Sequence, residues 1–426
     1  MKINLERIMI TTFLLVFTTF SIYTITSSSD TYQHYIISKE ILKNPNFLWT
    51  GENIFLTSTT FGKEGKNIIY AYPPFIHLIY AFFLLFNIPF KILNIVMIFI
   101  IGLSLWLLER KSIFFMFLSF LFVRSVAFGG EDLFLLILTL LCYYFFDKRP
   151  ILSGIFAGLA PLVKGIGFFI LFSYFLSVLI FKNKEIIKKD FYKNDYFLSF
   201  ILMILILLPW YLRNFILFKG DLFGTIVGQS LKTIGYSEQL IETGFQATQP
   251  ERYWWDTSGF YPLPIDLLFY TGIIFTFFNI FKKRKIELEH IFIIIFISFY
   301  FISQALNFSF LMTIRYQLSI FPLLAFQILK GIPEKYLKYS FIICLAFFIY
   351  FSLNLPKYSF NQLDVVMDTV CKQAKEQIDD EPVYVNAFHN WYTIYKCNLN
   401  ATIQEESKWT LDLYQGKLYP TNKIEE

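Results

Sequence analysis

Apolar residues fall in long runs along this chain, and the runs lack the polar face that a helix on the surface of a soluble protein shows. A helix of about 20 apolar residues spans a bilayer, and many of these runs reach that length with their flanks. The clearest runs are Ile8–Ile25, Ile98–Leu108, Ile113–Phe122, Leu133–Phe146, Ile201–Trp210, Leu267–Phe281, Ile291–Ile302 and Phe341–Phe351. The pattern therefore predicts an all-α polytopic membrane protein rather than a large soluble protein with buried helices.

Short clusters of lysine and arginine separate these runs and predict their orientation, because cytoplasmic loops hold an excess of these residues. The clusters are Lys2/Arg7, Arg110/Lys111, Lys148/Arg149, Lys182–Lys193, Lys282–Lys285 and Lys330–Lys338. They predict a cytoplasmic N-terminus and a first helix near 8–26, which we expect to be retained because no small-x-small cleavage pattern follows it. Together the runs and clusters predict about eleven spans. The later ones are expected near 113–128, 132–146, 151–180 (a hairpin with Lys164 at its outer tip), 196–217, 263–281, 289–306, 310–329 and 338–355.

Two long polar segments, 30–72 and 218–262, are predicted as outer loops of a membrane domain that covers residues 1–355. The apolar stretch 75–90 is short for a span and contains Asn87 and Pro89. If it crossed the membrane, the Arg110/Lys111 pair would lie outside, against the charge rule. We therefore expect it to be interfacial or re-entrant.

The tail, residues 356–426, has mixed charge and few apolar runs. Helical spacing in 364–378 and strand-like stretches at 382–387 and 400–404 predict a small α/β domain outside the membrane. Cys371 and Cys397 lie in this tail, where an oxidising compartment permits a disulfide. Two unpaired thiols fit the sequence equally well, since spacing does not fix connectivity.

Composition agrees with a membrane protein. Hydrophobic residues make up 56% of the 426 residues and charged residues 16%, and the mean hydropathy is +0.52. A soluble domain has about a quarter of its residues charged. The net charge of +5 does not indicate nucleic-acid binding, because the basic residues sit in the short clusters between apolar runs.

Charged residues at membrane depth are the best functional candidates, because an unpaired charge there costs several kcal/mol. On the predicted topology they all lie toward the outer side. They are Asp30, Arg124, Glu131, Asp132, Lys164, Arg213 and Arg315. Carboxylates suit a general base or a metal ion, and cations suit a phosphate group.

Four local patterns, in order along the chain, resemble motifs of the GT-C glycosyltransferases, which are multi-span enzymes that use polyprenyl- or dolichyl-phosphate sugars. The patterns are Asp30-Thr31-Tyr32-Gln33-His34-Tyr35, Tyr70-Ala71-Tyr72-Pro73-Pro74-Phe75-Ile76-His77, Arg124 to Asp132 with Gly129-Gly130-Glu131-Asp132, and Arg315-Tyr316-Gln317 with Phe321-Pro322. The third is similar to an acidic loop of oligosaccharyltransferases, and the fourth to a signature of protein mannosyltransferases and aminoarabinose transferases. The set spans most of the membrane part.

The resemblance implies an inverting transfer of a hexose or modified pentose from a lipid-phosphate donor to a lipid, glycan or protein acceptor on the outer face. Asp30 is then the general base, within hydrogen-bond reach of the acceptor nucleophile. Glu131 and Asp132 orient the acceptor or bind Mg²⁺ or Mn²⁺ together with Asp30. Donor binding is assigned to Arg315, whose guanidinium matches phosphate oxygens, and to Lys164, Tyr72, His77 and Arg213.

Structural interpretations of the same residues stay open. Asp30, Glu131 and Asp132 can be helix caps, and Arg315 can form an ion pair with Glu131 or Asp132. Lys164 can extend to the interface, and His34 and His77 can be hydrogen-bonded core residues. At the level of the protein, a transporter or lipid flippase and a non-catalytic scaffold homologue are the alternatives to an enzyme. Transporters often have repeated halves, and this sequence shows no repeat.

Overall fold

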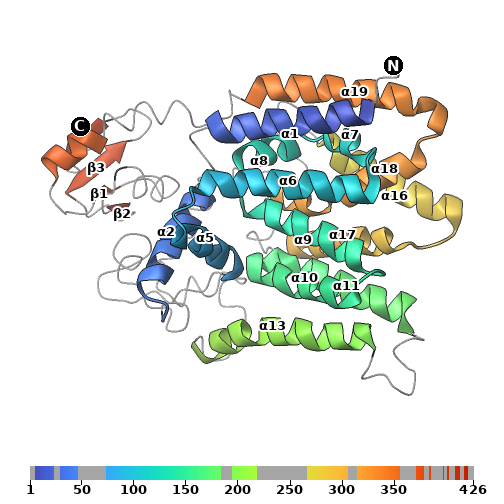
Figure 1. The fold of residues 1–426 in the computed structure, drawn as a ribbon, viewed down its shortest axis with the longest axis horizontal. Coiled ribbons are helices and arrows are strands. Elements are labelled where there is room, and N and C mark those ends of the chain that lie inside the picture. Colours follow the sequence, from blue (N-terminus) through green and yellow to red (C-terminus); the bar gives the residue numbers. More distant parts are fainter. Residues whose placement is uncertain are drawn as a thin grey trace.

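The apolar runs fold as helices in the computed structural model. It describes residues 5–23, 29–46, 73–183, 194–217, 266–305 and 314–355, and in the tail 371–378, 383–384, 397, 401–402, 408–412 and 417–420. The longer helices are α1 (Leu5–Tyr23), α6 (Phe90–Glu109), α9 (Glu131–Phe145), α10 (Pro150–Val163), α11 (Phe168–Phe181), α13 (Asp195–Leu217), α16 (Leu267–Lys283), α17 (Leu288–Ala305) and α19 (Glu334–Asn354). They run roughly parallel or antiparallel to one another (Figure 1).

Contacts between the helices define a layered bundle. α1 packs on α6, α6 on α9, α9 on α10, and α10 on α13, which lies at one edge (Figure 1). Glycines make the α10–α13 contact close, because the small residues Gly154 and Gly158 of α10 lie against Ser199 and Met203 of α13. Such small residues four positions apart allow two helix backbones to approach each other.

Three helical segments in the described part of the chain are long and apolar enough to span a membrane, namely Lys91–Glu109, Asp195–Ile216 and Glu334–Asn354. The number rises to four if the bent pair Phe120–Ala127 and Asp132–Phe145, which turns by 107°, counts as one span. Four further apolar helices among these residues are shorter, at 10–17 residues: Phe75–Leu85, Pro150–Val163, Gly165–Phe181 and Leu288–Tyr300. Within the described residues, length and composition therefore establish a helical protein with three or four candidate spans, against about eleven predicted for the whole chain.

Two predicted spans are broken, which corrects the sequence interpretation. The segment 113–128 forms α7 (Ser112–Met116) and α8 (Phe120–Phe128), because Ser119 begins a new helix by accepting a hydrogen bond from the Phe122 amide at 3.2 Å. In the predicted span 310–329, the described residues form the 3-10 helix η4 (Ile314–Ile320) and the short α18 (Phe321–Gly331), with Pro322 in the first turn of α18. Proline is favoured at that position and cannot continue a preceding helix.

The predicted outer loop 30–72 is also corrected in part. Residues Ser29–Lys43 form the helix α2, whose residues His34, Ile37, Ser38 and Ile41 are buried at helical spacing. It packs against α5 (Phe75–Leu85). α5 ends before Asn87, whose φ of 54° reverses the chain ahead of Pro89 and α6. With 11 residues α5 is too short to span a bilayer alone. Residues 47–72 and the second predicted loop, 218–262, lie outside the described residues.

The predicted hairpin at 151–180 is confirmed. α10 and α11 are joined by Lys164 and the 3-10 turn η1 (Gly165–Gly167).

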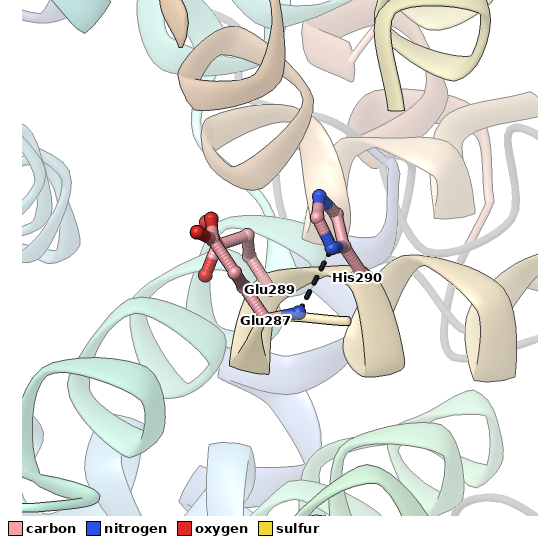
Figure 2. Close-up of side chains that lie close together, drawn as sticks. All are labelled: Glu287, Glu289 and His290. Atoms are coloured by element: carbon pink, nitrogen blue, oxygen red, sulfur yellow. Dashed lines mark hydrogen bonds between the residues drawn. The ribbon is translucent and has the colours of Figure 1, made fainter. Parts of the chain in front are cut away.

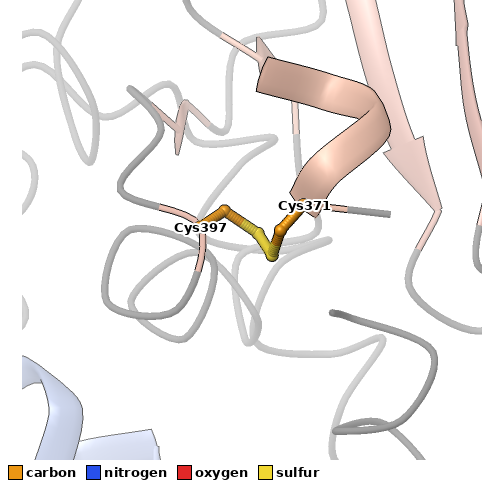
Figure 3. The surroundings of a disulfide bond; sticks show 2 residues. All are labelled: Cys371 and Cys397. Atoms are coloured by element: carbon orange, nitrogen blue, oxygen red, sulfur yellow. A yellow bond between two sulfur atoms is a disulfide. The ribbon is translucent and has the colours of Figure 1, made fainter. Parts of the chain in front are cut away.

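Strands occur within the described residues only in the tail, as a four-stranded sheet of order β2-β1-β3-β4. β1 (Val383–Tyr384) pairs in parallel with β2 (Ala401–Thr402) and β3 (Trp409–Asp412), and β3 pairs antiparallel with β4 (Lys417–Pro420). β1 and β2 lie in the two stretches predicted as strands, and 371–377 is helical within the predicted 364–378. Cys371 and Cys397 form a disulfide (Figure 3). It joins the short helix to the segment that precedes β2.

Basic residues gather at one end of the bundle. There Lys182, after α11, forms an ion pair with Asp147, after α9, at 2.8 Å, and Tyr196 of α13 donates to the Phe146 carbonyl at 3.2 Å. Arg110 lies over the Trp106 ring and Lys148 over the Tyr144 ring. The other cations of this end lie in the last turns of α16 and α18, directly after α16, or in the first turns of α19. We call this the basic end; α2, α5 and the tail sheet lie toward the opposite end (Figure 1).

Candidate functional site

The predicted acidic turn begins with two glycines that bend the chain sharply between α8 and α9. Gly129 has φ 76° and Gly130 φ 136°, which L-residues with a side chain rarely adopt. A Cβ on Gly129 would lie 2.2 Å from Oδ1 of Asn94, a buried residue of α6. The turn therefore depends on glycine both for its backbone conformation and for the close approach of the Asn94 amide.

Asp132 and Lys164, both predicted as site residues, are brought together by the packing of α9 on α10. The Lys164 Nζ lies 3.5 Å from Oδ1 of Asp132, and the two side chains are 17% and 12% exposed. Asp132 is the second residue of α9, where the helix dipole favours a negative charge. The pair thus places one anion and one cation, largely shielded from solvent, at the end of the bundle opposite the basic end.

The motif histidines form a second polar contact, between α2 and α5. Nδ1 of His34 and Nε2 of His77 are 2.8 Å apart, and the side chains are 3% and 1% exposed. The Ser38 hydroxyl donates to the carbonyls of both His34 and His77, at 2.6 and 2.8 Å. The first and second motif patterns therefore meet in space, which sequence reasoning did not predict.

Arg213 is buried near the C-terminal end of α13, with its guanidinium 4.5 Å from the Trp210 ring centroid. Its Nη1 donates to Oδ1 of Asn214 at 2.7 Å. The neighbouring Tyr211 donates to the Pro161 carbonyl at 3.4 Å, so Arg213 lies near the same end of α10 as Lys164.

Several predicted site residues lie outside what the structure describes. The side chains of Asp30, Glu131 and Arg315 are in this class, as is Tyr72 altogether. The backbone still locates three of them: Asp30 is in the first turn of α2, Glu131 begins α9, and Arg315 belongs to η4, which packs against α9. The predicted metal site of Asp30, Glu131 and Asp132 stays a prediction, and its one described side chain, Asp132, already faces the cation of Lys164.

A different group of carboxylates and histidine, which sequence reasoning missed, lies at the basic end. Potential ligand atoms of Glu287, Glu289 and His290 lie within 4.8 Å of one another (Figure 2). Two of the three already have charged partners: the Lys330 ammonium contacts both glutamates, and Lys283 lies 3.0 Å from Glu287. Burial alone would raise the pKa of Glu287, but the hydrogen bonds from Lys330 and Lys283 outweigh it and lower that pKa to about 2.

Both ring nitrogens of His290 are also engaged. Nδ1 accepts a hydrogen bond from the Glu287 amide at 3.0 Å (Figure 2), so Nε2 holds the proton of the neutral ring and donates to Oε1 of Gln327 at 2.9 Å. Asn279 donates to the same Gln327 oxygen. These contacts tie α16, α17 and α18 together, and Tyr143 of α9 adds a bond to Glu289. We interpret this group as a structural network rather than a metal site.

Comparison with known proteins adds no assignment. No protein-family model matches the chain, and a search of curated proteins finds no match.

Proposed function

We propose that the chain is an integral membrane glycosyltransferase of the GT-C kind, which moves a sugar from a polyprenyl- or dolichyl-phosphate donor to a lipid, glycan or protein acceptor. The observation that supports this most is the grouping of the motif segments: α2 contacts α5 through His34 and His77, Asp132 pairs with Lys164, and η4 packs on α9. Segments far apart in sequence thus meet near one end of an apolar bundle.

In this proposal the charged side chains of the motif segments carry out the transfer. Asp30 removes the proton of the acceptor nucleophile as that nucleophile attacks the anomeric carbon, and the lipid phosphate leaves. Arg315, Lys164 and Arg213 supply positive charge toward the donor phosphate, as the resemblance implies. Glu131 and Asp132 orient the acceptor. A divalent ion that used these carboxylates would be Mg²⁺ or Mn²⁺, since both prefer oxygen ligands.

Orientation is part of the proposal. The basic end faces the cytoplasm under the positive-inside rule. The opposite end, with the motif segments, and the tail then lie outside, and the Cys371–Cys397 disulfide supports an oxidising location for the tail. The proposed partners are the lipid-linked donor, the acceptor and membrane lipids.

The test is a transfer assay in proteoliposomes with radiolabelled polyprenyl-phosphate hexoses and a membrane-lipid extract. We expect label to move to an acceptor fraction with the wild type and not with Asp30→Asn. Glu40→Gln, an acidic residue of the same helix paired with Lys43, is the matched control and should transfer normally. Equal turnover by Asp30→Asn would refute the base assignment.

A lipid flippase is the second candidate, favoured by the 107° break between α8 and α9, because transporters use broken helices at their binding sites. It predicts that lipid crosses the proteoliposome membrane while the label stays on its original carrier. If the folded protein moves neither label nor lipid, the scaffold interpretation is favoured.

A further inference from the structure

The chain contains 4 histidines. Two of them, His34 and His77, are 43 residues apart in sequence and meet with their ring nitrogens 2.8 Å apart and their rings inclined at 62°. Both side chains are buried, and the Ser38 hydroxyl bonds to the backbone of each. Because both rings sit on helices that pack together, α2 and α5, the facing nitrogens are held in place before any ligand arrives.

We propose that His34 and His77 are two ligands of a divalent transition-metal ion, with Zn²⁺ as the best match. Neutral imidazole binds zinc at about 2.0–2.1 Å, so two such nitrogens lie about 2.9 Å apart at a right angle and about 3.4 Å apart in a tetrahedron. The observed separation of 2.8 Å would need to widen by only a few tenths of an ångström. The ion takes the lone pairs of both nitrogens, and the one proton between them moves to the other nitrogen of the ring that donates it, so that both rings stay neutral.

The hydrogen-bond partners of the histidine nitrogens distinguish this pair from the group at Glu287. There Nδ1 of His290 accepts from a backbone amide, whose proton does not leave, and Lys330 already neutralises the carboxylates. In the His34–His77 pair the bridging proton belongs to an imidazole, which can hold it on its other ring nitrogen when a metal ion binds. Imidazole ligands select zinc, copper or nickel over Mg²⁺ and Mn²⁺. This site therefore differs in ion class from the oxygen-only site predicted from the carboxylates.

Charge balance requires a third, anionic ligand, because a buried dication with two neutral ligands is costly. The sequence offers one at the spacing of a helical turn: Asp30 precedes His34 by four residues on α2, the spacing at which two residues of one helix share a metal in His-x-x-x-His sites. The metal would fix α2 on α5, whatever reaction the protein catalyses. The His34–His77 site itself does not depend on the proposed function, but Asp30 as a third ligand would engage the carboxylate that the proposed function uses as general base.

The experiment uses the full chain in nanodiscs, stripped of metal with a chelator and titrated with Zn²⁺ alone in a calorimeter. We expect one equivalent to bind to the wild type, and His34→Ala or His77→Ala to weaken binding at least about 100-fold. His290→Gln and His389→Ala, which change the other two histidines, are the matched controls and should bind as the wild type does.

A second measurement does not depend on the folding of any variant. Cu²⁺ bound to the wild type should show an electron paramagnetic resonance spectrum with hyperfine coupling to two imidazole nitrogens. Absence of Zn²⁺ binding at micromolar ion, or binding that survives both histidine substitutions, would overturn the proposal. The pair would then be a hydrogen bond that joins α2 to α5. Sugar transfer is not measured in either experiment, so failure here leaves the proposed function untouched.

Discussion

A methyl group added at Gly129 would be disfavoured both by the backbone conformation and by a steric clash. The backbone has φ 76° and ψ −171°, and the new Cβ would lie 2.2 Å from the Asn94 amide oxygen. A residue with a side chain in this backbone conformation destabilises the folded state by roughly 1–3 kcal/mol, and the clash with Asn94 adds to this. We expect Gly129→Ala to lower the thermal unfolding midpoint in detergent and to displace the turn that leads into Glu131 and Asp132.

Gly102→Ala is the control for that substitution. Its Cβ would lie 3.2 Å from the end of the Leu14 side chain and 3.6 Å from the Phe13 ring, and no unusual φ is involved. We expect a much smaller change in the midpoint. Equal unfolding temperatures for the two variants would contradict the conclusion that the turn requires glycine at position 129.

Sequence reasoning at the residue scale found individual charges but only some of their partners. Asp132 and Lys164 stood out because each interrupts apolar sequence, and the structure pairs them. The His34–His77 contact could not be predicted, since no local rule relates positions 43 residues apart. Asn94 was missed, although an amide within the apolar α6 was a signal: a buried polar side chain needs a partner.

At the scale of elements, the sequence predicts helices well where a charge marks the turn and poorly where apolar residues continue through a break. Lys164 marks the α10–α11 hairpin correctly. The α7–α8 break lies within an apolar run, and only the cap residue Ser119 indicates it. The polar composition of α2 predicts a loop, although Ile37 and Ile41 lie one helical turn apart and are buried.

The contact between α10 and α13 gives a prediction about packing. An alanine Cβ at Gly154 would lie 2.5 Å from the Ser199 Cβ and 3.0 Å from its backbone oxygen, whereas one at Gly158 would lie 3.1 Å from the Met203 Cα. Overpacking of this kind costs roughly 1–3 kcal/mol. We expect Gly154→Ala to lower the thermal midpoint more than Gly158→Ala does. The reverse order would contradict the closer approach of the two helices at Ser199.

The connection between α16 and α17 gives a prediction about pH. Hydrogen bonds from lysine outweigh burial and lower the pKa of Glu287 from 4.5 to about 2 in the folded protein. A carboxyl whose pKa is lowered by folding stabilises the folded state above its unfolded pKa and loses that contribution as the pH falls toward its folded pKa. We expect stability to decline from pH 4.5 downward, and the decline to be shallower in Glu287→Gln.

The readout for Glu287 is the difference in unfolding midpoint between wild type and variant, measured at about pH 5.5 and at about pH 3.5. Other carboxyl groups titrate in the same window and cancel in this difference. Glu334→Gln, at the first turn of the exposed start of α19, controls for the loss of one carboxylate at the same end of the bundle. A constant difference between wild type and Glu287→Gln at the two pH values would count against the assigned role of the lysines.

At the scale of the whole molecule, the sequence predicts a helical membrane protein with a distinct tail because composition changes abruptly near residue 356. It does not predict which ends of helices meet, since that depends on packing between distant segments. The two tail strands rich in local signals, β1 and β2, were found, whereas β3 and β4 were not. β3 does alternate apolar and polar residues, as Trp409-Thr410-Leu411-Asp412, but over only four residues, and β4 (Lys417–Pro420) does not alternate.

The disulfide in the tail gives a prediction about compartment. Cys371 and Cys397 are 26 residues apart in sequence, for which chain entropy gives roughly 3.5 kcal/mol of stabilisation. In intact cells we expect a maleimide reagent to label the tail only after reduction. The buried Cys142 and Cys344 should stay unlabelled until the protein is denatured. Labelling of Cys371 without reduction would place the tail in a reducing compartment and reverse the proposed orientation.

The basic end also makes the molecule electrically polar along its helices. A cell membrane is negative inside, and moving one elementary charge across 100 mV changes the free energy by about 2.3 kcal/mol. Arg110 and Lys148 lie over aromatic rings at that end. If the bundle inverted, each of these cations would have to move to the positive side of the membrane, which would raise the free energy. With the basic end in the cytoplasm, the resting potential therefore opposes inversion of the inserted chain. In vesicles without a membrane potential, this contribution to the barrier would be absent.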